Sequence, residues 1–272
     1  MKKLLSLLVA FGMVAALTAC AGDADSTASE STASESTASE TTETPAEDTA
    51  ETAATGTVMT HDEYMAADVD TQVTIETYVQ AKQSWWEDKA TVYAQGPDGA
   101  YFMYDMACSE EDYEKLTPGT CIRVTGYKAE WSGEVEIMEG TFEFVAGADT
   151  YVAEPLDVTE LLGTDELIDH QNELVSFKGL TVEPSTVEGS DEEYAFLYNW
   201  DGSGTDGDDL YFNASYNGET YTFTIESYLC DNTTDVYNAV KNLEVGQTID
   251  MEGFLYWYEG VNPHITNVTV TG

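Results

Sequence analysis

Basic side chains are scarce in this sequence. Of 272 residues, only 9 are Lys or Arg and 3 are His, whereas 52 are Asp or Glu, so the formal net charge is −43. A protein that binds DNA, RNA or an anionic membrane surface by charge attraction needs Lys and Arg side chains that displace counterions. The composition therefore predicts that nucleic acid is disfavoured as a partner.

Catalytic signatures are also missing. The sequence contains no H-E-x-x-H, G-x-S-x-G, P-loop or C-x-x-C pattern. The run Gly202-Ser-Gly-Thr-Asp-Gly207 matches dinucleotide-binding glycine spacing, but its Asp neighbours would repel a pyrophosphate and the next residues indicate a strand. We therefore expect no enzyme activity. A secreted hydrolase is the least favoured alternative, since a catalytic carboxylate pair could not be distinguished among so many acids.

The N-terminus carries a secretion signal. Lys2 and Lys3 precede the short apolar run Leu4 to Leu17, which is too short to span a membrane comfortably. Leu17-Thr-Ala-Cys20 then resembles the lipobox of bacterial lipoproteins. That resemblance implies a signal peptide over residues 1–20, lipidation of Cys20, and export to the outer face of the cell membrane, where the chain is lipid-anchored in the bacterial envelope.

A low-complexity segment follows over residues 21–57. Three tandem copies of Ser-Thr-Ala-Ser-Glu occupy Ser26 to Glu40, and the segment contains no base and no aromatic residue. Such a composition cannot bury enough apolar surface to offset the entropy lost on ordering. We predict a disordered, acidic linker rich in Ser, Thr, Ala and Glu that separates the lipid anchor from a folded region.

The remaining sequence contains an internal repeat. Residues of the same type recur in register near the end of each copy: Leu116, Gly119, Ile122 and Gly126 correspond to Leu243, Gly246, Ile249 and Gly253. Asp98-Gly99 and Asn217-Gly218 are matching hairpin signals. Residues 73–77 and 175–179 alternate as half-buried strands. The pattern in each copy therefore predicts three strands, followed by a short helix and two further strands.

This order resembles the OB-fold, a five-stranded barrel with a helix between its third and fourth strands. We predict an all-β fold with short helices, in which two tandem five-stranded OB-fold-like barrels occupy residues 58–147 and 154–272. The chain is similar to bacterial lipoproteins with tandem OB-fold domains, a poorly characterised group. An unrelated β-sandwich with similar hairpins is the alternative.

Aromatic residues gather in the loops where OB-folds bind ligands, which are those after the first and fourth strands. The candidate ligand-binding residues are Trp85, Trp86, Trp131, Lys82, Lys89 and Lys128 in the first copy, and Tyr256, Trp257 and Tyr258 in the second. Rings beside ammonium groups suit the stacking of sugar rings, aromatic ligands or bases. Alternatively, the rings belong to the core or pack the two copies together.

Two further features have structural alternatives. The oxygens of Asp201, Asp206, Asp208 and Asp209 form a weak Ca²⁺ candidate, but their spacing is not that of an EF-hand, so no cofactor is expected. Cys108 and Cys230 occupy equivalent positions and suggest small buried hydrophobes. A disulfide between Cys108 and Cys121 stays open as an alternative, because sequence cannot give their separation.

Together these features predict a non-catalytic binding or interaction module on the cell surface. Its unknown ligand is expected to be a carbohydrate or another envelope or extracellular molecule in preference to nucleic acid. A structural envelope protein with a protein partner is the alternative.

Overall fold

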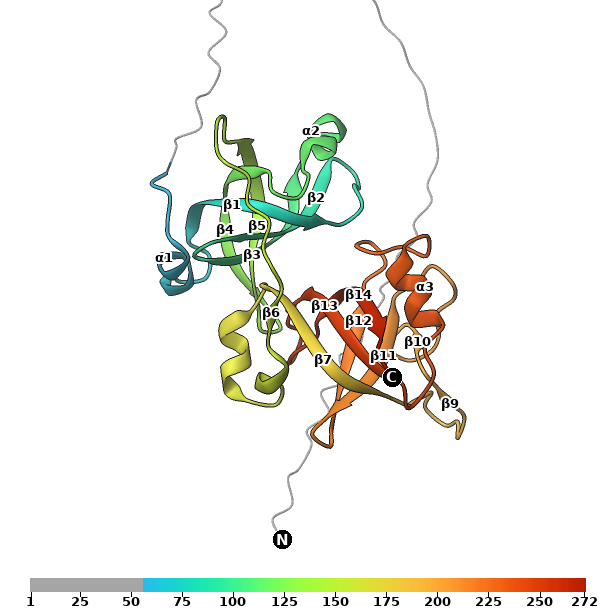
Figure 1. Ribbon diagram of the computed structural model, residues 1–272. Helices are drawn as coiled ribbons and strands as arrows, with labels where there is room; N and C mark the ends of the chain where they lie inside the picture. The colour runs from blue at the N-terminus through green and yellow to red at the C-terminus, as the bar shows by residue number, and fades with distance from the viewer. Residues whose placement is uncertain (1–55) are drawn as a thin grey trace, which may run out of the picture. The chain divides into compact units, whose positions relative to one another are not determined.

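A computed structural model describes residues 56–272 (Figure 1). The predicted signal peptide, the lipidation of Cys20 and nearly all of the predicted linker lie outside the described residues and stay predictions. In the described part, no helix is long and apolar enough to cross a membrane. The described helices are short: α1 (His61–Ala66), α2 (Glu110–Lys115), α3 (Asp235–Lys241), and the 3₁₀ turns η1 (Thr159–Leu161) and η2 (Asp165–His170).

The first barrel is a closed sheet of five strands in the order β1-β2-β3-β5-β4. All neighbouring pairs are antiparallel except β3 and β5, which are parallel. The strands are β1 (Gln72–Lys82), β2 (Lys89–Gly96), β3 (Gly99–Ala107), β4 (Cys121–Trp131) and β5 (Glu134–Phe144). Helix α2 lies between the third and fourth strands, as expected for an OB-fold.

The second barrel repeats this order. Strand β7 pairs with both β11 and β13, β12 lies between β11 and β14, and β13 pairs with β14, which closes the ring. The strands are β7 (Leu174–Glu183), β11 (Leu210–Tyr216), β12 (Glu219–Ile225), β13 (Thr248–Phe254) and β14 (His264–Val270), with short additions β6 (Leu156–Asp157), β8 (Ser185–Thr186), β9 (Glu193–Tyr194) and β10 (Leu197–Tyr198). The predicted pair of five-stranded OB-fold-like barrels is confirmed.

The repeated glycines Gly126 and Gly253 have the same structural role in the two barrels. Each lies on the fourth strand at an irregularity in its pairing with the fifth strand. A Cβ atom on Gly126 would lie 2.8 Å from the carbonyl oxygen of Met138, and one on Gly253 would lie 2.3 Å from the carbonyl oxygen of His264. Only glycine permits this close approach of backbones, which explains why the repeat retains it.

Each barrel has its own apolar core, and a third cluster joins them. Tyr93, Phe102 and Phe254 are all buried, the first two in barrel 1 and the last in barrel 2. The rings of Tyr93 and Phe254 stack with centroids 4.6 Å apart. Contacts between the barrels therefore include a small aromatic core as well as polar groups.

Candidate functional site

OB-fold barrels hold ligands on the face of their second and third strands and in the flanking loops. In barrel 1 this face is formed by β2 and β3, and in barrel 2 by β11 and β12. Each of these faces borders a cleft, and the two clefts differ in accessibility and charge.

Barrel 2 covers part of the β2–β3 face of barrel 1. Phe102 packs edge-on against Tyr256, with ring centroids 5.2 Å apart. The hydroxyl of Tyr93 lies 2.6 Å from Nδ1 of His264. In addition, both the backbone N–H and the hydroxyl of Ser84 donate to the carbonyl of Tyr228, at 2.7 and 3.1 Å. This coverage removes the centre of the face from solvent.

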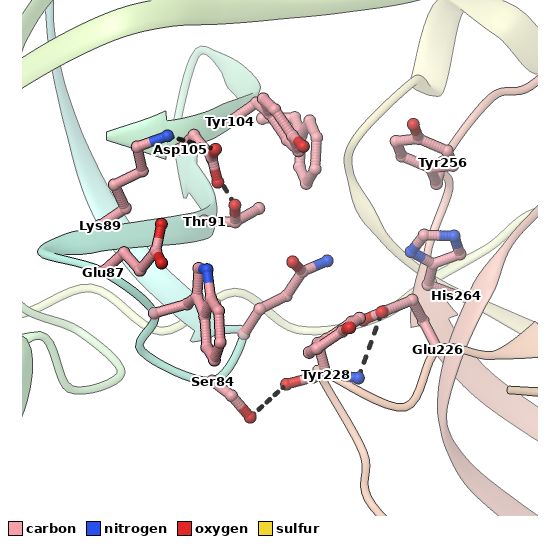
Figure 2. Close-up of a pocket in the computed structure, with 13 residues that line it drawn as sticks. Ser84, Glu87, Lys89, Thr91, Tyr104, Asp105, Glu226, Tyr228, Tyr256 and His264 are labelled. Atoms are coloured by element: carbon pink, nitrogen blue, oxygen red, sulfur yellow. Dashed lines mark hydrogen bonds and ion pairs between the residues drawn. The ribbon is translucent and has the colours of Figure 1, made fainter. Parts of the chain in front are cut away.

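The rest of that face forms an acidic cleft of about 570 Å³ between the barrels. Figure 2 shows its walls, with one set of side chains from barrel 1 and a second set from barrel 2. The charged and aromatic lining residues are Trp86, Glu87, Lys89, Phe102, Tyr104, Asp105, Glu226, Tyr228, Tyr256 and His264. Lys89 pairs with Asp105 at 2.9 Å, which leaves Glu87 and Glu226 without a cationic partner among the described residues.

Two titratable groups of barrel 2 have shifted pKa values in this cleft. Burial raises the pKa of Glu226 to about 7, although its carboxylate accepts backbone N–H bonds from Tyr228 and Leu229 at 3.1 and 2.8 Å. Burial lowers the pKa of His264 to about 3, so its ring is neutral at physiological pH. Sequence reasoning did not select either residue.

The β11–β12 face of barrel 2 borders an open cleft of about 450 Å³. None of the described residues that line it is Asp, Glu, Lys, Arg or His; they are Pro184, Ser185, Thr186, Leu197, Trp200, Tyr211, Asn213, Thr222, Tyr258, Val261 and Asn262. Trp200 is 76% exposed and Tyr258 is 47% exposed. Burial raises the pKa of the Tyr211 hydroxyl to about 12, so that side chain also stays uncharged.

The polar side chains of this open cleft are partly fixed by their neighbours. Asn213 donates to the carbonyl of Pro184 at 3.3 Å and accepts from the hydroxyl of Thr222 at 2.9 Å. The side-chain carbonyl of Asn262 accepts from Thr224 at 2.7 Å, whereas its amide N–H₂ has no hydrogen-bond partner in the described part of the chain. Asn262 can therefore donate to a ligand.

A pair of buried acids lies where the barrels meet. Glu134 is fully buried and accepts the backbone N–H of Trp257 at 2.9 Å, while its second oxygen has no hydrogen-bond partner among residues 56–272. Burial raises the pKa of Glu134 to about 8 and that of its near neighbour Glu136 to about 7. These carboxyls hold protons at pH values where acids are usually ionised.

The structure does not bring the predicted ligand-binding residues together. Trp86, Lys89 and Tyr256 line the acidic cleft, and Tyr258 lines the open cleft. Two of the others are hydrogen-bonded to the backbone: the Lys82 ammonium donates to the carbonyl of Tyr113, and the Trp85 indole donates to the carbonyl of Cys108. Lys128 is buried, and Trp257 lies against Gly133. Trp131 is 59% exposed.

Lys128 shows why its predicted role as a ligand partner does not fit. Its ammonium donates to the carbonyls of Met65 and Ala67 at 2.7 and 2.8 Å, so it satisfies carbonyl groups at the end of α1. The sequence could not reveal this role, because α1 is distant from Lys128 along the chain. Trp200, by contrast, had a sequence signal: it is a tryptophan in a polar loop, next to Asp201, which we considered only as a cation ligand.

In the acidic loop after β10, the carboxylate of Asp206 is bonded by residues from outside the loop. Asp206 accepts from Lys241 and from Asn232, and the Lys241 ammonium lowers the pKa of that carboxyl. Within residues 56–272, no group of three or more His, Cys, Asp or Glu residues is placed to hold a metal ion.

The cysteines of this part, Cys108, Cys121 and Cys230, are free thiols, so the alternative of a Cys108–Cys121 disulfide is wrong.

No protein-family model and no curated protein matches the sequence. Among solved structures, the chain is similar to the Ifi202 HINa domain in complex with 20-bp dsDNA (14% identity, 75% of this chain and 96% of that chain, TM-score 0.33). It is similar to a murine DNA-binding protein bound to dsDNA (9% identity, 73% and 96%, TM-score 0.36). A third likeness is to a replication protein A heterotrimer bound to ssDNA (12% identity, 75% and 51%, TM-score 0.30).

These comparisons correct several expectations. The three similar structures named above are bound to DNA, which corrects the expectation that a carbohydrate or envelope ligand is preferred to nucleic acid; the cell-surface location stays a prediction. The expectation that nucleic acid is disfavoured as a partner is corrected in the same way. Net charge describes whole domains, whereas the described lining of the open cleft contains no ionised side chain. Identities of 9–14% concern the fold alone.

Proposed function

We propose that barrel 2 binds single-stranded nucleic acid through its bases, on the face formed by β11 and β12. One observation carries this proposal: Trp200, Tyr211 and Tyr258 line a single cleft together with amides and hydroxyls, and no ionised side chain is among its described lining residues. The cleft has the position at which OB-folds bind oligonucleotides, with contributions from the loops after the first and fourth strands.

The three rings suit unpaired bases. Trp200 comes from the loop between β10 and β11, Tyr211 from β11, and Tyr258 from the loop between β13 and β14. Each base that stacks on an aromatic side chain contributes roughly 1–3 kcal/mol, with little preference for sequence. The free amide N–H₂ of Asn262 can donate to an acceptor on a base edge.

The charge distribution gives this binding an unusual salt dependence. With no Lys or Arg in the cleft lining, the phosphates gain no ion pair there, while the acidic chain repels them. Salt screens that repulsion and leaves base stacking largely unaffected. We therefore expect the affinity for a natural oligonucleotide to rise with salt, the opposite of the dependence produced by phosphate contacts.

The test is fluorescence anisotropy of a labelled oligothymidine, titrated with the full chain at low and at moderate salt. A neutral-backbone oligomer of the same bases serves as the second probe, and its affinity is expected not to depend on salt. Trp200→Ala should weaken binding of both probes by roughly 10- to 100-fold. The matched control is Trp131→Ala, which removes an exposed tryptophan outside both clefts.

Three results would overturn the proposal. The first is an absence of binding by either probe at moderate salt. The second is an affinity that falls steeply with salt, because that would indicate phosphate contacts at a different surface. The third is tight binding of neutral oligosaccharides with the same dependence on Trp200, which would assign the cleft to sugars.

A further inference from the structure

The acidic cleft between the barrels has the features of a second, independent site. Its rim carries three accessible rings, because Trp86 is 68% exposed, Tyr228 is 64% exposed and Tyr104 is also exposed. Trp86 and Tyr104 belong to barrel 1 and Tyr228 to barrel 2, so the rings come from both barrels. An aromatic face attracts a cation, and several rings around one cavity are the common means of holding an organic ammonium group.

The carboxylates of the cleft favour the same kind of ligand. Glu87, Asp105 and Glu226 contribute acidic groups, whereas Lys89 is the single basic side chain among the described lining residues. Lys89 is already paired with Asp105. An entering ammonium or guanidinium group would therefore find carboxylates without a cationic partner beside the rings.

The buried wall of the cleft offers a hydrogen-bond donor. His264 is only 6% exposed, its ring is stacked on Tyr256 with centroids 4.3 Å apart, and Figure 2 shows it among the cleft residues. The Gln83 amide donates to the Tyr93 hydroxyl at 3.4 Å, and that hydroxyl lies 2.6 Å from Nδ1 of His264. The buried Tyr93 hydroxyl has no other acceptor for its proton within residues 56–272, so its O–H donates to Nδ1.

This arrangement fixes the tautomer of the His264 ring. A neutral imidazole whose Nδ1 accepts a hydrogen bond carries its proton on Nε2. Nε2 has no hydrogen-bond partner within residues 56–272 and is not among their fully buried unpartnered atoms, so it is a donor that a ligand in the cleft can reach. A ligand that carries an acceptor atom can therefore hydrogen-bond to Nε2–H.

We infer that this cleft binds a ligand with an ammonium or guanidinium group and a hydrogen-bond acceptor, which is the chemistry of a peptide segment bearing Lys or Arg. The cationic group would lie among Trp86, Tyr104 and Tyr228 and near Glu226. A backbone carbonyl of the peptide would accept a hydrogen bond from Nε2–H of His264. This site is separate from the open cleft of barrel 2, so either proposal can fail without the other.

The test compares three probes by calorimetry with the full chain: acetyl-Gly-Lys-Gly-amide, its counterpart with norleucine in place of lysine, and tetramethylammonium. The norleucine peptide keeps the acceptors and removes the charge, whereas tetramethylammonium keeps the charge and removes the acceptors. We expect the lysine peptide to bind at least 10-fold more tightly than either. Tetramethylammonium binding as tightly as the lysine peptide would show that a free organic cation is the ligand, and would contradict the role of His264.

Variants connect this binding to the cleft. Trp86→Ala and Glu226→Gln should each weaken lysine-peptide binding by about 3- to 30-fold, whereas Trp131→Ala and Trp200→Ala should leave it unchanged. The inference is overturned if the norleucine peptide binds as well as the lysine peptide, or if both cleft variants keep full affinity. Oligothymidine binding that depends on Trp86 rather than Trp200 would also overturn it, by assigning the cleft to nucleic acid.

Discussion

The two barrels present the same face to opposite surroundings. Counted from the hairpin turn, the cross-strand pair Tyr93 and Phe102 in barrel 1 occupies the position of Asn213 and Thr222 in barrel 2. The first pair is aromatic and buried against the neighbouring barrel, and the second is polar and lines an open cleft. One cross-strand pair therefore decides whether this face of an OB-fold packs against protein or stays available to a ligand.

The largest expected effect comes from giving barrel 1 the residue of barrel 2. Phe102→Thr removes a ring that is 2% exposed and leaves a cavity between Tyr93 and Tyr256. By analogy with other truncations of buried aromatics, we expect a loss of about 3–5 kcal/mol in the free energy of unfolding. Urea denaturation followed by tryptophan fluorescence measures it.

The reverse exchange, Thr222→Phe, is the matched control. It places a ring on the open face, where nothing is buried, so stability should change by less than about 0.5 kcal/mol. Equal losses of stability in the two variants would mean that packing against the neighbouring barrel does not set the face of barrel 1 apart from that of barrel 2.

A smaller effect is expected where the barrels are most alike, at Gly126 and Gly253. The nearest backbone atom to a Cβ on Gly253 is the carbonyl oxygen of His264 at 2.3 Å, whereas the nearest backbone atom to one on Gly126 is the carbonyl oxygen of Met138 at 2.8 Å. Overpacking typically costs about 1–3 kcal/mol. We expect Gly253→Ala to lie at the upper end of that range and Gly126→Ala at the lower end, as measured by thermal unfolding. A larger loss for Gly126→Ala than for Gly253→Ala would show that β14 moves away from an added methyl group more easily than β5 does.

The contact between the barrels should also depend on pH. The folded-state pKa of Glu134, about 8, lies above its ordinary value of 4.5, so the folded chain retains a proton that the unfolded chain has lost. Stability from this group is therefore fully present below pH 4.5 and is lost as pH rises through 8. Glu136 and Glu226, each with a pKa raised to about 7, act in the same direction.

The measurement is the free energy of unfolding between pH 6.5 and pH 8. His264 has the opposite sign, but its contribution changes only below its ordinary pKa of 6.5. Glu134→Gln keeps a neutral side chain of the same shape, so its stability should fall less with pH than that of the unaltered chain. Parallel pH profiles for the two proteins would show that Glu134 is ionised in the folded state.

The fold could be predicted because its signals are local and occur twice. Alternating strands, the hairpin turns and the recurring Gly126 and Gly253 each restrict a few neighbouring residues, and their repetition gave the strand order. The site could not be predicted in the same way. Lys128 and Trp257 were selected as ligand-binding loop residues, yet one satisfies carbonyls near α1 and the other lies where the barrels meet.

Net charge was a poor guide to the lining of the two clefts. It is a sum over a domain, whereas a ligand interacts with the few side chains around it. The chain has a net charge of −43, and the described lining of the open cleft includes none of those acids. The acidic cleft escaped prediction for a related reason, because its wall combines Glu87 with Glu226, which lie far apart in the sequence.

The central claim is that the face of barrel 2 is open to unpaired bases while that of barrel 1 is closed by protein. The most direct test is two-dimensional NMR of the labelled full chain, titrated with a short oligothymidine at moderate salt. We predict shifts at β11, β12 and the flanking loops, with the indole N–H of Trp200 among the largest. Shifts centred on Trp86 and β2–β3, or none at all, would contradict the claim.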